Sequence, residues 1–393
     1  MSVSFIVTSY NIAPYIGQCL DSLRPCLRPG DQLVLVDDGS TDETVEMVER
    51  MAAGGFGHDI EWTPVWLGTN TIGGVGIPGN IGLNHVRRDT VFFVDGDDYL
   101  LPEAFLRARA DYEANPTDIR FTDYLEYDDQ KRQTKAPADA HRWAGLNRAM
   151  SPKETQLAAL GLIAVPWRKF YRTEFLRRHR ICYPEGDFFF EDNPFHWQVC
   201  TLAQSIAFSR IVVCHHRINR PGQTMASTGL ELAAFFTHFR TIMSMLPAGR
   251  ADLRQQAVRW LLGNMSWHVE RLKPQALFGY AREAHAAVKL VSDADWDAIS
   301  SEMATTAIWH QATRLRVGGL WEVVEAWRRE ALSGEQTRML CSLDSRLREL
   351  LREVRASRHI LDAQRAVEEF EALKGLMSAQ SSIRDLSEDG YHG

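Results

Sequence analysis

The chain has 393 residues, of which 45% are hydrophobic and 24% are charged, and its formal net charge is −7. This composition is typical of a folded globular protein, and the length favours two domains with a full hydrophobic core. A negative chain is a poor nucleic-acid binder, because phosphate binding needs a positive field. The six cysteines include no CxxC pair, so we expect reduced and mostly buried thiols in a cytoplasmic protein.

The amino-terminal residues enter a strand-like run at once, without a basic leader or a small-residue cleavage site, so no signal peptide is expected. No apolar run approaches the roughly 18 to 20 residues that a membrane-spanning helix needs. We therefore expect a cytoplasmic protein whose closest association with a membrane is peripheral contact at its inner face.

Short apolar runs alternate with helical patterns over the first 127 residues. The runs predict strands at Val3–Thr8, Leu33–Val36, Ile60–Leu67 and Thr90–Val94, of which the first two are expected to be buried, and a strand with alternating polar and apolar residues at Ile119–Tyr127. Helices are expected after Pro14, after a cap at Ser40 or Thr41, from about Asn80, and from Pro102. This alternation predicts an α/β fold with a Rossmann-like, mostly parallel sheet flanked by helices.

The remainder of the chain has a different sequence pattern. Residues 128–150 are rich in charge and show no regular helix or strand pattern, which favours a loop on the surface. From about residue 229 the pattern is helical throughout. We expect an α/β domain over residues 1–228 and an all-α domain over residues 229–393. Leucines recur at spacings of three and four from Leu340 to Val354, as in a coiled coil, but Ser357 and Gln364 interrupt the repeat. A long helix packed within its own domain is the preferred interpretation.

Three carboxylates follow the fourth predicted strand, Asp95, Asp97 and Asp98, with only Gly96 between the first two. Carboxylates this close repel one another unless a cation or a proton lies among them. Mg²⁺ and Mn²⁺ prefer oxygen ligands and leave coordination positions for substrate phosphates. We therefore predict a Mg²⁺ or Mn²⁺ site, with Asp97 as a direct ligand and Asp95 bonded to the metal, its water or the nucleotide sugar. A helix-capping turn would explain one of the carboxylates but not three.

Asp37 and Asp38 follow the second predicted strand. The carboxyl ends of parallel strands meet at one edge of a sheet, so this pair and the acidic cluster are expected to share a cleft. One of the two aspartates would then accept hydrogen bonds from a nucleobase or ribose. Ordinary turn chemistry before Gly-Ser-Thr is the open alternative.

The ordered set of segments resembles the inverting family-2 glycosyltransferases with the GT-A fold. The matching segments are FIVTSYN from Phe5, VLVDDGSTDET from Val34, GNIGLNH from Gly79, FFVDGDD from Phe92, KFYRTEFL from Lys169, PEGDFFFED from Pro184 and HHRINRPGQT from His215. The resemblance ends near Thr224. It departs from the family pattern at Gly79, where an arginine often precedes the asparagine.

The resemblance implies a role for each matching residue. Thr8, Tyr10, Asn11, Asp37, Asp38 and Asn80 would form the nucleotide pocket; Asp95 and Asp97 would be the DxD pair; Glu191 and Asp192 would be the ED pair, with Asp192 as the catalytic base; His216 would add a metal or diphosphate contact; and Arg217 and Arg220 would neutralise the diphosphate. The implied donor is a nucleotide sugar, with UDP the expected nucleotide, and the implied acceptor is a glycan or a lipid-linked saccharide in polysaccharide biosynthesis.

The chemistry of the residues agrees with these roles. Displacement at an anomeric carbon needs a base for the acceptor hydroxyl, a cation at the diphosphate, and positioning. The aromatic residues around Asp192 should raise its pKa, whereas Glu191 is equally explained as a carboxylate at a helix start. Neighbouring strand residues face opposite ways, so at most one of His215 and His216 reaches the cleft. Trp167 and Trp197 are expected in the core, with stacking on an acceptor sugar as the alternative.

Two other functions are compatible with parts of the sequence. A nucleotidyltransferase of sugar phosphates also uses paired aspartates, but it should have a glycine-rich phosphate loop after the first strand, which TSYNIAPYIG lacks. A non-catalytic protein that binds glycans or nucleotides would not need the ED pair. The carboxyl-terminal helices are expected to place the acceptor or to form a homodimer.

Overall fold

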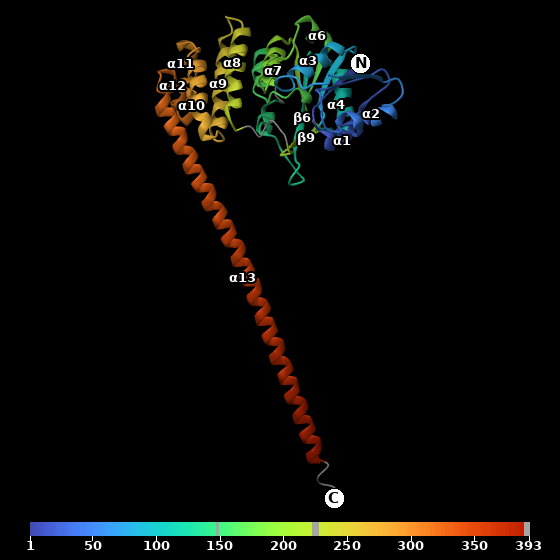
Figure 1. Cartoon of the computed structure of the whole chain (residues 1–393), viewed down its shortest axis with the longest axis vertical. Helices are drawn as coiled ribbons and strands as arrows, with labels where there is room; N and C mark the ends of the chain where they lie inside the picture. Colours follow the sequence, from blue (N-terminus) through green and yellow to red (C-terminus); the bar gives the residue numbers. More distant parts are fainter. Residues whose placement is uncertain (147–148, 222–227, 389–393) are drawn as a thin grey trace. The chain divides into compact units, whose positions relative to one another are not determined.

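The computed structural model describes residues 1–146, 149–221 and 228–388, and the side chains at 333–338, 340–341, 356–362 and from 380 onward lie outside the described part. The chain divides into two compact units, Met1–Trp327 and a second that begins at Arg328. Figure 1 shows the elements in chain order. The first unit holds the sheet and helices α1 to α12.

A nine-stranded sheet in the order β3-β2-β1-β4-β8-β6-β9-β5, with β7 paired to β6, forms the centre of the first unit. The strands are β1 Val3–Ser9, β2 Gln32–Asp37, β3 Glu61–Trp66, β4 Thr90–Asp95, β5 Tyr99–Leu100, β6 Ile119–Asp128, β7 Gln133–Lys135, β8 Lys169–Arg172 and β9 Ile206–Ile218. Strands β1 to β4 are parallel, as predicted, whereas β8 is antiparallel to β4 and β6. The α/β class is confirmed, and the later strands make the sheet mixed.

Thirteen α-helices are described. They are α1 Ala13–Leu23, α2 Thr44–Ala53, α3 Gly76–His85, α4 Pro102–Ala114, α5 Pro152–Leu160, α6 Thr173–Arg178, α7 Asp192–Leu202, α8 Ala234–Met245, α9 Ala251–Val269, α10 Leu277–Val288, α11 Asp293–Met303, α12 Ala307–Arg316 and α13 Leu320–Glu388. Within the described ranges, none is long and apolar enough to cross a membrane.

The buried runs form strands because both of their faces are covered. Phe5, Ile6 and Val7 of β1 are fully buried. Helix α3 lies so close to β1 that a Cβ added at Gly82 would stand 2.4 Å from Ile6. This helix begins at Gly76, four residues before the predicted start, because a proline in the first turn needs no N–H partner.

The start of α2 differs from the prediction of a Ser40 or Thr41 cap. The helix begins at Thr44, and the Asp42 carboxylate accepts the backbone N–H of Thr44 at 3.0 Å. The Ser40 hydroxyl donates instead to Asp37, at 2.6 Å. An aspartate nearer to the helix therefore replaces the hydroxyl, as Asx turns do in general.

Residues 128–150 are not only a surface excursion. Asp139 accepts a hydrogen bond from Arg168 at 2.7 Å, and both side chains are almost fully buried. The Trp143 ring is buried beside the same guanidinium, 5.0 Å from its centre. A charged stretch thus supplies a buried ion pair, which could not be predicted from this stretch alone because Arg168 lies on a distant segment.

Helices α8 to α12 belong to the same compact unit as the sheet, and α8 packs against α7 and α9 (Figure 1). The predicted boundary after residue 228 therefore marks a change of element type, and as a domain boundary it stays a prediction. Beyond Arg328, the large apolar side chains described on α13 are exposed, among them Leu343 and Leu347. They do not pack within a core, contrary to the preferred interpretation of this helix.

Candidate active site

The carboxyl ends of β1, β2 and β4 form one edge of the sheet. Strand β1 pairs with β2 through Ser9 and Asp37, and with β4 through Thr8 and Asp95. The aspartates therefore lie on either side of the end of β1. The Thr8 carbonyl accepts the N–H of Gly96 at 3.0 Å, which ties the acidic turn to β1.

Asp37 and Asp38 are both buried and differ in their partners. Asp37 accepts hydrogen bonds from the hydroxyls of Ser9 at 2.8 Å and Ser40 at 2.6 Å, so it holds the turn. Asp38 accepts the Thr71 N–H at 2.9 Å and Asn70 Nδ2 at 3.1 Å. Burial raises the pKa of Asp38 above its usual value. Asp38 therefore fixes the glycine-rich connection between β3 and α3 at the edge of the cleft.

Tyr10 and Asn11 follow β1 at this edge. Asn11 has a φ of +49°, and its side-chain oxygen accepts the N–H of Thr41 at 2.8 Å. The Tyr10 side chain remains exposed. Asn11 thus braces the β2–α2 loop, while Tyr10 presents a free aromatic ring beside the end of β1.

Asp95, Asp98 and His216 converge at the end of β4. Their ligating atoms lie within 4.8 Å of one another, an arrangement compatible with a bound metal ion. His216 Nδ1 is 2.9 Å from an Asp98 oxygen. Burial opposes a charged imidazole, but Asp98 and its neighbours outweigh this effect and raise the pKa of His216 to about 9. Burial, together with Asp98 and Asp97, raises the pKa of Asp95.

Asp97 points to a different partner from the other two carboxylates. It forms an ion pair with Arg220, whose guanidinium lies over the Tyr15 ring. Arg217 is buried; its backbone N–H donates to Asp98 at 2.7 Å, and its side chain donates to the Asp97 carbonyl at 2.9 Å. Arg217 thus orients the acidic turn from within the protein, whereas Arg220 pairs with a carboxylate predicted to bind metal.

The two members of the ED pair have distinct environments. Glu191 is buried, and its Oε1 accepts the N–H groups of Gly74 at 2.9 Å and Gly76 at 3.0 Å. Asp192 is the first residue of α7, and its Oδ1 is buried without a hydrogen-bond partner among the described residues. Burial, and then the charge of Glu191, raises the pKa of Asp192 to about 7. Glu191 is therefore an anchor for the 74–76 loop, and Asp192 has the properties of a base.

The polar atoms of Asn80, a predicted nucleotide contact, are used within the protein. Its Nδ2 donates to the Tyr183 carbonyl at 3.0 Å and to Glu185 at 2.8 Å, and its Oδ1 accepts the Tyr183 N–H at 2.8 Å. Asn80 therefore joins α3 to the segment that leads to the ED pair.

Two further buried side chains belong to the site: sequence reasoning assigned no role to Lys169, and it expected Trp167 in the core. Lys169 begins β8, its Nζ donates to the Val165 carbonyl at 2.5 Å, and burial lowers its pKa to about 7. The Trp167 ring is buried and stacks on His216 with 4.8 Å between the ring centres. Trp197 is in the core, as preferred. His215 contacts the Tyr99 hydroxyl at 2.7 Å, so only its neighbour His216 joins the acidic cluster.

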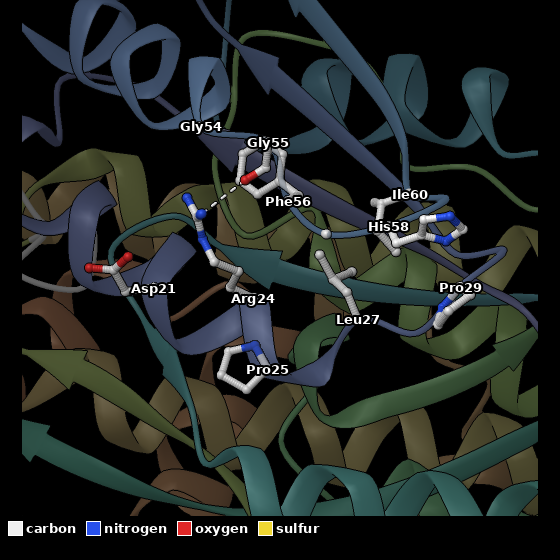
Figure 2. Close-up of a pocket in the computed structure, with 11 residues that line it drawn as sticks. Asp21, Arg24, Pro25, Leu27, Pro29, Gly54, Gly55, Phe56, His58 and Ile60 are labelled. Carbon is white, nitrogen blue, oxygen red and sulfur yellow. Dashed lines mark hydrogen bonds between the residues drawn. The ribbon is translucent and has the colours of Figure 1, made fainter.

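A separate cavity of about 540 Å³ lies away from the carboxylates (Figure 2). Its lining comes from the end of α1, from the α1–β2 connection that holds Arg24, and from the α2–β3 connection that holds Phe56 and His58. The Arg24 side chain points to the Gly55 carbonyl, to which it donates at 2.9 Å. These segments precede β2 and β3, whereas the acidic residues follow β2 and β4. The cavity thus shares no residue with the site.

The glycosyl transferase family 2 model matches residues 4–180, which include the nucleotide edge and the acidic cluster. Residues 4–180 thus form a glycosyl transferase family 2 region of the chain. The uncharacterized glycosyltransferase EpsJ of Bacillus subtilis (strain 168) is 28% identical over 204 residues, 52% of this chain and 57% of its own length. The poly(ribitol-phosphate) beta-N-acetylglucosaminyltransferase TarS of Staphylococcus aureus (strain Mu50 / ATCC 700699) is 27% identical over 62% of this chain and 40% of its own length.

The chain spans only about half the length of these curated relatives. A crystal structure of S. aureus TarS residues 1–349 in complex with UDP-GlcNAc matches with a TM-score of 0.65 and 22% identity, over 84% of this chain and 92% of that one. The likeness establishes that the GT-A fold predicted from the sequence is present. It includes residues beyond the 4–180 segment, because it covers most of the chain.

Proposed function

We propose that the chain is an inverting, metal-dependent glycosyltransferase that moves a sugar from a UDP-sugar to a hydroxyl of a glycan or lipid-linked saccharide, with Asp192 as the base. One observation carries the proposal. The partly buried Asp192 carboxylate has a raised pKa, and its buried Oδ1 has no hydrogen-bond partner among the described residues. It lies within electrostatic reach of an acidic cluster that suits a divalent cation, since Asp192 is among the charges that raise the pKa of Asp95.

The proposed reaction is a single displacement. The acceptor oxygen attacks the anomeric carbon as its proton passes to the Asp192 carboxylate, and the bond between that carbon and the diphosphate oxygen breaks on the opposite face. A base with a pKa of about 7 is half ionised at neutral pH, which suits general-base catalysis. Glu191 does not compete for this role, because two backbone N–H groups already occupy its carboxylate.

Asp95, Asp98 and His216 would hold the metal, and Asp97 would join them once it leaves Arg220. Carboxylate oxygens and one imidazole suit Mn²⁺ or Mg²⁺. A bound ion would supply positive charge for the diphosphate that departs. Arg220 would then be free to pair with the same diphosphate. The nucleoside would lie beside Tyr10, with Asp38 and the 70–71 loop at its edge.

A thermal-shift screen of nucleotide sugars tests the donor assignment, because a ligand that binds only the folded state raises its stability. A UDP-sugar in Mn²⁺ should raise the melting temperature of the wild type, and Asp95→Asn should abolish the shift. Asp187→Asn, which changes an exposed carboxylate in the segment that leads to the ED pair, is the matched control and should retain the shift. Equal shifts in EDTA and Mn²⁺ would contradict the metal assignment.

We also propose that α13 pairs with α13 of a second copy. Leu343, Leu347, Leu350 and Val354 follow the alternating spacing of a coiled-coil seam, and each is at least 44% exposed. Ion pairs between Arg348 and Asp344 at 2.8 Å and between Arg346 and Glu349 at 2.6 Å mix both charge signs along this part of the helix. Mixed charge suits a protein partner better than an anionic membrane.

Sedimentation velocity tests the pairing. The wild type should be a dimer, Leu347→Asp should be a monomer, and Ser345→Asp, about half a turn away, should remain a dimer. A monomeric wild type that binds anionic vesicles would show that α13 binds a membrane surface and not a second copy. A monomeric wild type that does not bind vesicles would also contradict the proposed pairing.

A further inference from the structure

The loop that leads to the ED pair is held in place by helix α8. This loop runs from Pro184 to Glu191, directly before α7, and α8 belongs to the helical region that follows residue 228. Helix α8 places Phe235 and His238, three residues apart, on the same face. Both side chains are buried, and both contact the loop.

His238 donates a hydrogen bond from Nε2 to the Phe189 carbonyl at 2.6 Å. A carbonyl only accepts, so Nε2 carries the proton, and Nδ1 is buried without a partner among the described residues. Burial lowers the pKa of His238 to about 4, so the imidazole is neutral at physiological pH. The Phe188 ring also meets the imidazole edge-on, with 4.9 Å between the centres.

Phe190 is the next residue, and its backbone adopts a conformation that needs support. Its φ is +67°, which a residue with a side chain adopts only when its surroundings enforce it. The Phe190 carbonyl accepts the N–H of Asn193 at 3.1 Å and its side-chain Nδ2 at 3.0 Å, and the ring packs on Phe235 at 4.8 Å. Helix α8 on one side and the first turn of α7 on the other thus enforce this turn.

The turn sets the position of the two carboxylates that follow it. Glu191 reaches Gly74 and Gly76, and an added Cβ on Gly73 would stand 2.4 Å from the Gly186 carbonyl. The 73–76 loop and the ED loop are therefore in contact along their length. A shift at Phe189 or Phe190 would move both loops together, along with Asp192.

We infer that His238 is a positioning residue for Asp192: its hydrogen bond to Phe189 fixes the ED loop, which makes helix α8 part of the catalytic apparatus and not a separate acceptor module. The effect on turnover rests on the proposed function, whereas the effect on the loop does not. Positioning matters because a displacement of about 1 Å at a reacting group can cost on the order of a hundredfold in rate.

Three variants isolate the bond. His238→Phe keeps a ring and removes the donor, and His238→Gln keeps a donor at a similar reach. His285→Phe is the matched control, since His285 makes a comparable 2.6 Å bond to the Leu315 carbonyl between α10 and the end of α12. Phe235→Leu is a second route to a loosened loop, and it tests the inference should His238→Phe fail to fold.

Amide hydrogen exchange at Gly74 and Gly76 is the readout that does not depend on activity. Exchange there should be about tenfold faster in His238→Phe and Phe235→Leu, and unchanged in His238→Gln and His285→Phe. In the transfer assay, kcat should fall at least about tenfold in His238→Phe, with donor KM within about threefold, and His238→Gln should restore most of it.

The outcomes separate the two proposals. Equal exchange at Gly74 and Gly76 in the His238→Phe and His285→Phe variants would overturn the positioning inference, whatever the activity. So would a kcat that falls equally in both variants. Wild-type turnover in Asp192→Asn would overturn the proposed function, and the exchange result would still decide whether His238 fixes the loop.

Discussion

Asp192→Asn should stabilise the fold at alkaline pH while it removes turnover. The pKa of Asp192 is raised from 3.8 to about 7, so between these values the native carboxyl keeps a proton that the unfolded chain has lost. The free energy of unfolding of the wild type therefore falls as pH rises through this window. Asp192→Asn does not lose stability in this way, because an asparagine does not titrate. Three pKa units correspond to about 4 kcal/mol at most. The carboxyl is partly exposed, so solvent screens its charge, and it is coupled to Glu191. We therefore expect about half of this maximum free-energy change.

Urea unfolding at pH 5 and pH 8, in EDTA, measures the effect. The stability advantage of Asp192→Asn over the wild type should grow by about 1 to 2 kcal/mol between the two pH values. Asp187→Asn, exposed on the same loop, should show no growth. An advantage for Asp192→Asn that is absent, or equal at both pH values, would refute the claim that burial holds this carboxyl in its neutral form.

Three further predictions concern turnover, backbone and charge. Turnover of the wild type should rise about tenfold from pH 6 to pH 8, following the ionisation of Asp192, and a flat profile would contradict a base with a pKa of about 7. Gly73→Ala, at a φ of +82° and against a facing carbonyl, should lower stability by about 1 to 3 kcal/mol more than Gly68→Ala, at a φ of +74° in open space, when both are unfolded in urea. Asp98→Asn should lower the His216 pKa from its value of about 9 in an NMR titration, and an unchanged value would show that Asp98 does not stabilise the imidazolium.

Strands β1, β2 and β4 of the parallel half of the sheet were predictable because they are buried on both faces. Phe5, Ile6 and Val7 form a continuous apolar run that only a covered strand tolerates. The meeting of Asp37 and Asp95 at one edge then follows from the parallel direction of β1, β2 and β4. Local sequence and one rule of topology were sufficient for this part of the site.

Asp192 was expected to be the base of the ED pair, but the role of Glu191 as an anchor was not predictable. Glu191 and Asp192 are neighbours in sequence, and only the N–H groups of Gly74 and Gly76, more than a hundred residues away, make the first an anchor. Asn80 likewise bonds to Tyr183 and Glu185. Such roles depend on which distant backbone groups need a partner.

The contribution of helix α8 to the site could not be predicted for a related reason. His238 lies in a run of aromatic residues that reads as an ordinary helix core, and its use depends on the strained turn at Phe190. The positive φ at Phe190 has no signal in the residue type, since glycine and asparagine are the usual occupants of such positions. The buried partner of Asp139 was missed in the same way, because Arg168 approaches it from a separate segment.

The role of Asp192 as the base is the central claim, and turnover measured beside nucleotide binding in Asp192→Asn tests it most directly. Calorimetry in Mn²⁺ should give a UDP dissociation constant within about threefold of the wild type, while kcat for sugar transfer should fall by about 10²- to 10⁴-fold. Turnover within about tenfold of the wild type, with the variant folded and UDP bound, would contradict the assignment.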